Sequence, residues 1–143
     1  MQHILVVAHK TLGGQPLLDE VRSRMESGSC QVHIVVPVTH PMGAYTEASM
    51  HADAAKVLEA GIRSIRELDA TGSIDVTGEV GDASPIYAVD AVVNRGQRFD
   101  EIIVSTLHPK ASRWLKADVP SRLARHFSVP VTHVVADSEG ADR

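Results

Sequence analysis

The segment from Ser105 to Arg125 holds the side chains with the clearest chemistry. It reads STLHPKASRWLKADVPSRLAR, and Lys110, Arg113 and Lys116 lie close together within it. Cationic side chains of this kind can bind an anion such as a phosphate. The segment contains no glycine, and glycine is the residue that lets a backbone approach phosphate closely with positive φ. An anion at this segment is therefore expected to be held by side chains.

Ser105 is the candidate nucleophile of this segment, with His108 or His9 as the possible base. A serine hydrolase needs a carboxylate that orients its histidine, and many carry a Gly-x-Ser-x-Gly turn around the nucleophile. The sequence shows neither feature near Ser105. We therefore assign no catalytic residue, and we expect Ser105 and Thr106 to cap the backbone at a strand end.

Charge and cysteine content exclude several classes of protein. The net charge of -4 opposes general attraction to nucleic acid or an acidic membrane surface. A single cysteine, Cys30, offers neither an internal disulfide nor a paired zinc motif, which favours a reducing compartment. The first residues lack a positive leader and a cleavage site, and no apolar span reaches about 18 residues. We expect a cytoplasmic protein without nucleic-acid or membrane partners.

Five apolar runs alternate with four segments of helical periodicity, which predicts a parallel sheet with crossover helices. With 3% aromatic residues, the core must consist of aliphatic side chains. Residues 1–136 are expected to form one domain, and residues 137–143 a polar tail. The predicted strands span residues 4–8, 31–38, 73–80, 99–106 and 129–136, and the predicted helices span residues 16–28, 46–69, 85–95 and 119–127.

Two of these helices carry more detailed predictions. Periodicity predicts that the buried stripe of the long helix consists of Ala48, Ala52, Ala55, Ile62 and Ile65. Pro120 forbids one smooth helix from Ser112 onward, so Asp118 is expected to cap a helix that begins at Val119. Trp114 then lies in a loop, where we expect it to pack against the core.

Two passages resemble the universal stress protein family. They are GDASPIYAVDAVVNRGQRFDEIIVS, residues 81–105, and RLARHFSVPVTHVV, residues 122–135. The order of strands and helices is similar to that of the family along essentially the whole chain. The resemblance implies a three-layer α/β fold of the adenine nucleotide alpha hydrolase-like kind. In it, an open parallel five-stranded sheet has the order 3-2-1-4-5 and helices on both faces.

The resemblance also implies a comparison with the ATP-binding branch of that family. That branch has an Asp at the end of the first strand, where this chain has His9, and a glycine-rich loop after the fourth strand. Ser105 and His108 stand at the first two glycine positions, and Ala117 and Asp118 stand at the final Gly-Ser pair. A carboxylate at a helix start competes for amide donors and repels phosphate. The resemblance thus implies a branch with a degenerate ATP loop.

In open parallel sheets, ligands bind beyond the carboxyl ends of the strands, where the connections reverse direction. With the implied strand order, this crevice lies between the first and fourth strands. The alternative is a solvated basic loop that binds nothing. The candidate ligand-binding residues are His9, Lys10, Ser105, Thr106, His108, Lys110, Arg113 and Lys116.

Three histidines suggest a metal-site alternative. His9, His40 and His108 follow the first, second and fourth strands, which are neighbours in the implied order. Three imidazoles form a ligand set that zinc accepts. The site requires their loops to converge within a few ångströms, which histidines in loops usually do not do.

The fifth strand, residues 129–136, is apolar and lies at an edge of the implied sheet. Pairing with the same strand of a second copy would cover this edge, so we expect a homodimer. The resemblance implies a non-enzymatic dimeric protein of stress adaptation that binds a small ligand or a partner protein, with ATP binding weak or lost. The alternative is an adenine-nucleotide-binding protein, or a weak nucleotide hydrolase, with phosphate contacts from Lys110, Arg113 and Lys116.

Overall fold

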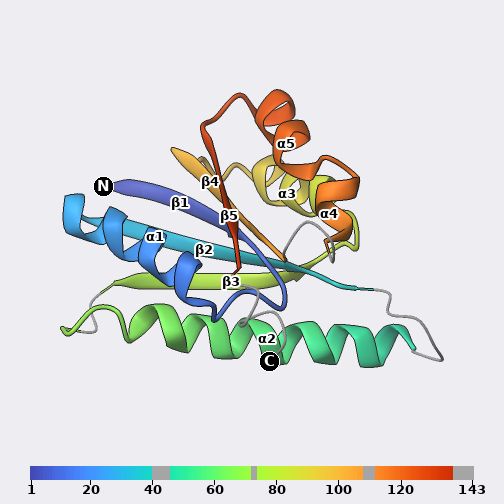
Figure 1. Cartoon of the computed structure of the whole chain (residues 1–143), viewed down its shortest axis with the longest axis horizontal. Coiled ribbons are helices and arrows are strands. Elements are labelled where there is room, and N and C mark those ends of the chain that lie inside the picture. Colours follow the sequence, from blue (N-terminus) through green and yellow to red (C-terminus); the bar gives the residue numbers. More distant parts are fainter. Residues whose placement is uncertain (40–45, 72–73, 108–111, 137–143) are drawn as a thin grey trace.

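Five parallel strands form one sheet in the order β3-β2-β1-β4-β5 (Figure 1). The structure is a computed structural model, and it describes residues 1–39, 46–71, 74–107 and 112–136. It confirms the predicted α/β fold and strand order. The strands are β1 (Gln2–Val7), β2 (Cys30–Pro37), β3 (Asp75–Gly81), β4 (Glu101–Thr106) and β5 (Val131–Val135).

Helices cover both faces of the sheet, as predicted (Figure 1). One face packs against α1 (Gln15–Ser27) and α2 (Glu47–Arg66). The other packs against α3 (Pro85–Asn94), α4 (Arg113–Lys116) and α5 (Val119–Phe127). Alternation of side chains along each strand separates the two cores. On β1, for example, Ile4 and Val6 face α1 and α2, whereas Leu5 and Val7 face α3 and α5.

The buried stripe of α2 differs from the predicted one. Ala48 and Ala52 are exposed, and the buried residues are Met50, Ala54, Gly61 and Ile65. Large side chains decide which face is buried, because apolar area removed from water sets the driving force. Gly61 lets α2 approach the loop after β1 closely, because a Cβ at Gly61 would lie 2.1 Å from Cδ2 of Leu12.

The segment before α5 is more ordered than predicted. Residues 113–116 form the short helix α4, where a loop was expected. Trp114 lies on α4 and is partly buried against the core under α3 and α5, which confirms that it packs against the core. Pro37 ends β2, in keeping with its missing amide donor. β5 is shorter than predicted, and the predicted polar tail, residues 137–143, lies outside the described residues.

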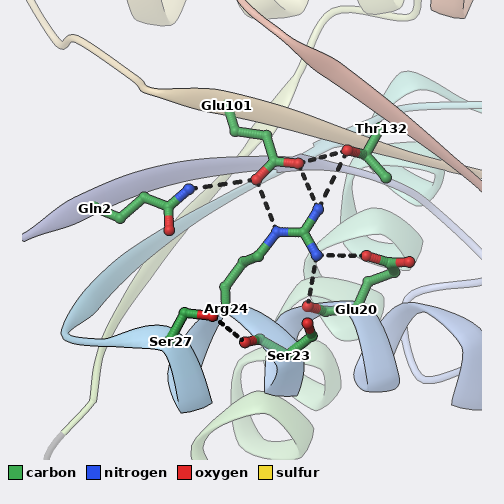
Figure 2. Close-up of polar contacts among 7 residues, drawn as sticks. All are labelled: Gln2, Glu20, Ser23, Arg24, Ser27, Glu101 and Thr132. Atoms are coloured by element: carbon green, nitrogen blue, oxygen red, sulfur yellow. Dashed lines mark hydrogen bonds and ion pairs between the residues drawn. The ribbon is translucent and has the colours of Figure 1, made fainter.

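A paired polar cluster lies at the amino-terminal ends of the strands, between α1, β4 and β5 (Figure 2). Its centre is Glu101 on β4, a carboxylate with only 7% of the residue exposed. Nε and Nη2 of Arg24 on α1 donate to its two oxygens at 2.9 and 2.6 Å. The Thr132 hydroxyl and the Gln2 amide donate to the same carboxylate, and Nη1 of Arg24 donates to Glu20 at 2.6 Å.

This pairing sets the charge states within the cluster. The hydrogen bond from Arg24 is the main cause that lowers the pKa of Glu101, against the opposing effect of burial. The same bond raises the pKa of Arg24. Both groups therefore remain charged at neutral pH. The cluster joins four elements, α1, β1, β4 and β5, through groups whose hydrogen bonds are satisfied, as buried ions require.

No helix in the described ranges is long and apolar enough to cross a membrane.

Candidate functional site

A cavity of about 610 Å³ opens at the carboxyl-terminal ends of β1 and β4. This is the crevice at which open parallel sheets bind ligands, and the volume lies within the usual range for small-molecule sites. The start of α3 and the segment of α4 and α5 complete its walls. Lining residues include His9, Ser84, Ser105, Thr106, Trp114 and Arg122.

His9 is the residue of this cavity whose buried polar atoms lack hydrogen-bond partners among the described residues. The residue follows β1 and is 8% exposed. Neither Nδ1 nor Nε2 has a hydrogen-bond partner in the part of the chain that the structure describes. Native proteins pair nearly all buried polar groups, and each unpaired group costs about 1–3 kcal/mol. An unpaired buried imidazole that lines a cavity therefore indicates a place for a ligand.

The surroundings of His9 favour its neutral form. Burial lowers the pKa of His9, nearby Lys10 lowers it further, and Asp53 on α2 acts in the opposite direction. A neutral imidazole offers one donor nitrogen and one acceptor nitrogen. His9 thus carries one donor and one acceptor nitrogen, both buried beside the cavity.

Ser105 and Thr106 line the cavity as predicted, but their hydroxyls already have partners. The Ser105 hydroxyl donates to Oγ1 of Thr11 at 2.7 Å. Oγ1 of Thr106 lies 2.8 Å from Nε2 of His133, a histidine whose pKa burial lowers. The hydrogen bonds of both hydroxyls within the described residues thus go to side chains. Both are engaged with side chains from neighbouring elements, and these contacts shape the cavity floor.

The charged groups on the cavity wall are cationic. Among the described lining residues, Lys10 and Arg122 carry a charge at neutral pH, and carboxylates are absent. Sequence reasoning identified Lys10 but missed Arg122. No sequence signal placed Arg122 at the cavity, because its position depends on how α5 packs through its buried residues Val119 and Leu123. This lining favours an anionic ligand.

Asp118 does not cap α5 in the expected way. Its backbone is left-handed, with φ 56° and ψ 40°, and its side chain makes no capping hydrogen bond. A capping residue needs an extended backbone to place its oxygen over the first turn. The Asp118 carboxylate instead lies 3.9 Å from Nη2 of Arg125 on the exposed side. The expected competition between this carboxylate and a ligand for the α5 amides is thus not present.

Several predicted ligand residues fall where their contacts are not described. His108 and Lys110 lie outside the described residues. Arg113 and Lys116 lie on α4, whose backbone is described but whose two cationic side chains are not. His40 and His108, two members of the hypothetical zinc site, also lie outside the described ranges. Within those ranges, no three metal-ligating side chains come together.

Comparisons with known proteins support the fold. No family model matches the chain. No curated protein matches either. Among solved structures, the chain is similar to a universal stress protein crystallised in complex with cAMP, with a TM-score of 0.58 and 15% sequence identity. The match covers 95% of this chain and 98% of the other. The chain therefore has the fold of a universal stress protein.

Proposed function

We propose that the protein binds a small anionic ligand, a purine nucleotide with a single phosphate, in the cavity between β1 and β4. The observation that carries this proposal is the buried imidazole of His9, which lines the cavity and whose two nitrogens have no hydrogen-bond partner among the described residues. Lys10 and Arg122 supply positive charge at the same wall. The similar universal stress protein, whose structure contains cAMP, is consistent with this ligand class.

A single phosphate fits this chain better than a triphosphate. The segment after β4 lacks the glycines that let a backbone surround a phosphate chain. Side-chain cations can still neutralise a compact anion. ATP is therefore expected to bind weakly or not at all. We further propose a non-enzymatic role in stress adaptation, on the basis of the family resemblance and the fold.

Isothermal titration calorimetry with AMP, cAMP and ATP, each with and without Mg²⁺, tests the proposal. We expect saturable binding of a monophosphate and at least about tenfold weaker binding of ATP, a difference of about 1.4 kcal/mol. His9→Ala should weaken monophosphate binding by about tenfold or more, because a buried partner is lost. His51→Ala, on the exposed side of α2, is the matched control. Absence of binding by all three nucleotides contradicts the proposal.

The same experiment tests the alternative in which cationic side chains of the segment between β4 and α5 bind the phosphates. In that case ATP binds at least as well as AMP, and Lys110→Ala or Arg113→Ala weakens ATP more than AMP. This result would replace the monophosphate proposal with a nucleotide-binding or weakly hydrolytic function. Measurement of phosphate release from ATP then separates binding from hydrolysis.

We also propose a homodimer in which β5 pairs with β5 of a second copy. Among the described strands, β5 pairs with β4 alone, and Val135 on it is 37% exposed. An open apolar edge of this kind invites pairing, and a charge on an edge strand opposes it. Analytical ultracentrifugation should show a dimer for the wild type and a monomer for Val135→Lys. A monomeric wild type at micromolar concentration contradicts the proposal.

A further inference from the structure

A second polar cluster, formed by His33, Thr77, Glu79 and Arg95, lies on the sheet away from the cavity. His33 on β2 stands opposite Thr77 on β3 in the strand register. Nδ1 of His33 lies 2.7 Å from Oγ1 of Thr77, and Nε2 lies 2.8 Å from Oε1 of Glu79. Thr77 is exposed, whereas His33 is only 9% exposed. A hydroxyl at the surface is thus joined through a buried imidazole to a carboxylate.

The charge on Glu79 fixes the direction of these hydrogen bonds. Burial acts to raise the pKa of Glu79, but hydrogen bonds from Arg95 and His33 outweigh burial and lower it. An ionised carboxylate can only accept, so Nε2 of His33 carries the proton. In the neutral imidazole, Nδ1 is then a bare lone pair and accepts from the Thr77 hydroxyl. The cluster therefore pairs a hydroxyl with a base in the correct tautomer.

The imidazole and the carboxylate are both held in place. The His33 ring stacks on Phe99 with centroids 6.2 Å apart and planes at 29°. Arg95, at the end of α3, donates to the Glu79 oxygen that also faces His33. A nucleophile, a base within hydrogen-bond reach and a group that orients the base are the parts of nucleophilic catalysis. Fixed partners of this kind keep such an arrangement ready for reaction.

We propose that Thr77 is a nucleophile that accepts acyl groups from activated esters or thioesters. Oγ1 of Thr77 attacks the acyl carbonyl carbon and forms a new C–O bond while its proton moves to Nδ1 of His33. The tetrahedral intermediate then collapses, the bond to the leaving group breaks, and the leaving oxygen or sulfur takes that proton from Nδ1. The products are acyl-Thr77 and the free alcohol or thiol, and His33 returns to its neutral form. Glu79 is a positioning residue that keeps the proton on Nε2.

The position of Thr77 restricts the substrates. β3 is an edge strand that pairs with β2 alone among the described strands. Alternate amides of an edge strand point away from the sheet, where they can donate to the oxyanion of the intermediate. Thr77, His33 and Glu79 do not line the cavity at the ends of β1 and β4. They do not line the smaller hollow on α5 either. The substrates should therefore be small acyl groups with good leaving groups.

Reaction of the full chain with p-nitrophenyl acetate tests this assignment. We expect a burst of p-nitrophenolate matched by the mass increase of a single acetyl group, which peptide mass spectrometry places on Thr77. Thr77→Val should reduce the burst rate by at least about 100-fold, to the background of the solution reaction, since both nucleophile and general base contribute on this scale. Thr77→Ser should retain the burst because it keeps the hydroxyl.

Three further variants separate an effect on the reaction from an effect on packing. His33→Gln should lose the burst, whereas His51→Ala, which removes an exposed histidine on α2, should keep it. Glu79→Gln should move the acid limb of the pH–rate profile to lower pH, because loss of the carboxylate makes the imidazolium less stable. A purely structural Glu79 would leave this profile unchanged. Acetylation confined to lysines or other histidines, or an equal burst in Thr77→Val, overturns the assignment.

Discussion

The two ends of the sheet treat buried polar groups in opposite ways. At the amino-terminal end, the buried carboxylate of Glu101 has hydrogen bonds from Arg24, Thr132 and Gln2. At the carboxyl-terminal end, the buried imidazole of His9 has no partner for either nitrogen among the described residues. A cluster whose hydrogen bonds are all made holds its helices and strands together. A buried polar group without a hydrogen-bond partner lowers stability, and a ligand that supplies the partner removes that cost. Burial alone therefore does not mark a candidate functional residue, and our proposal for His9 depends on its lack of a partner among the described residues.

The largest effect on stability is expected from removing Arg24, which pairs with the buried Glu101 at the amino-terminal end of the sheet. Arg24→Met leaves Glu101 buried without its cation and should lower the free energy of unfolding by about 3–5 kcal/mol. Urea denaturation measures this change. Arg22→Met, whose exposed guanidinium is 4.0 Å from Asp19, is the matched control and should change stability by less than about 0.5 kcal/mol. A loss below about 1 kcal/mol for Arg24→Met would show that Glu101 does not depend on it.

A double substitution sharpens that result. Arg24→Met with Glu101→Leu removes both charges, so no ion remains buried without a partner. Most of the lost stability should return, to within about 1 kcal/mol of the wild type. If the double variant is as unstable as Arg24→Met alone, packing rather than charge explains the loss.

At the cavity, a substitution is expected to change the free energy of unfolding in the opposite direction. His9→Leu removes two nitrogens that have no partner within the described ranges, and should raise the free energy of unfolding of the ligand-free protein by about 1–3 kcal/mol. The same substitution should weaken ligand binding, a trade of stability against function that functional sites commonly show. Urea denaturation without added nucleotide measures the gain. A loss of stability instead would mean that His9 has a structural partner.

A smaller effect is expected from pH. The pKa of His9 in the folded chain lies below its ordinary value of 6.5 because of burial and Lys10. As pH falls below about 6.5, the unfolded chain takes up a proton at His9 that the folded chain does not take up. The free energy of unfolding of the wild type therefore decreases as the pH decreases. His9→Leu lacks this titration. The stability difference between His9→Leu and wild type should therefore grow as pH falls from about 7 to about 5. A constant difference would mean that His9 titrates normally in the folded chain.

The smallest effect is expected at the cavity floor. Ser105→Ala leaves the Thr11 hydroxyl without its donor and should cost about 1 kcal/mol of stability. Ser105→Thr keeps a hydroxyl and serves as the comparison. A loss in nucleotide affinity without any loss in stability would show that Ser105 contacts the ligand directly.

The sequence predicted the fold well because apolar runs and helical periodicity define the sheet and its coverings. It erred on part of α2, because Ala48 and Ala52 are exposed and Met50 and Ala54 are buried instead, whereas Ile65 is buried as predicted. It also erred at Asp118, because residue type favours a cap but the backbone there is left-handed. His9 and Lys10 could be placed at the cavity from the strand ends together with the strand order that the family resemblance implied. Arg122 could not, since its place depends on how α5 packs, and the lack of a partner for His9 is a property of three-dimensional contacts.

Nitrogen NMR of histidine-labelled protein tests the central claim most directly. Titration with AMP should shift the imidazole nitrogens of His9, assigned from the signal that His9→Leu lacks, because a new hydrogen-bond partner changes their shielding. The signal of His51, which is exposed on α2, should stay in place. If AMP binds and the His9 signals do not move, His9 is not the group that holds the ligand and the account of the cavity is wrong.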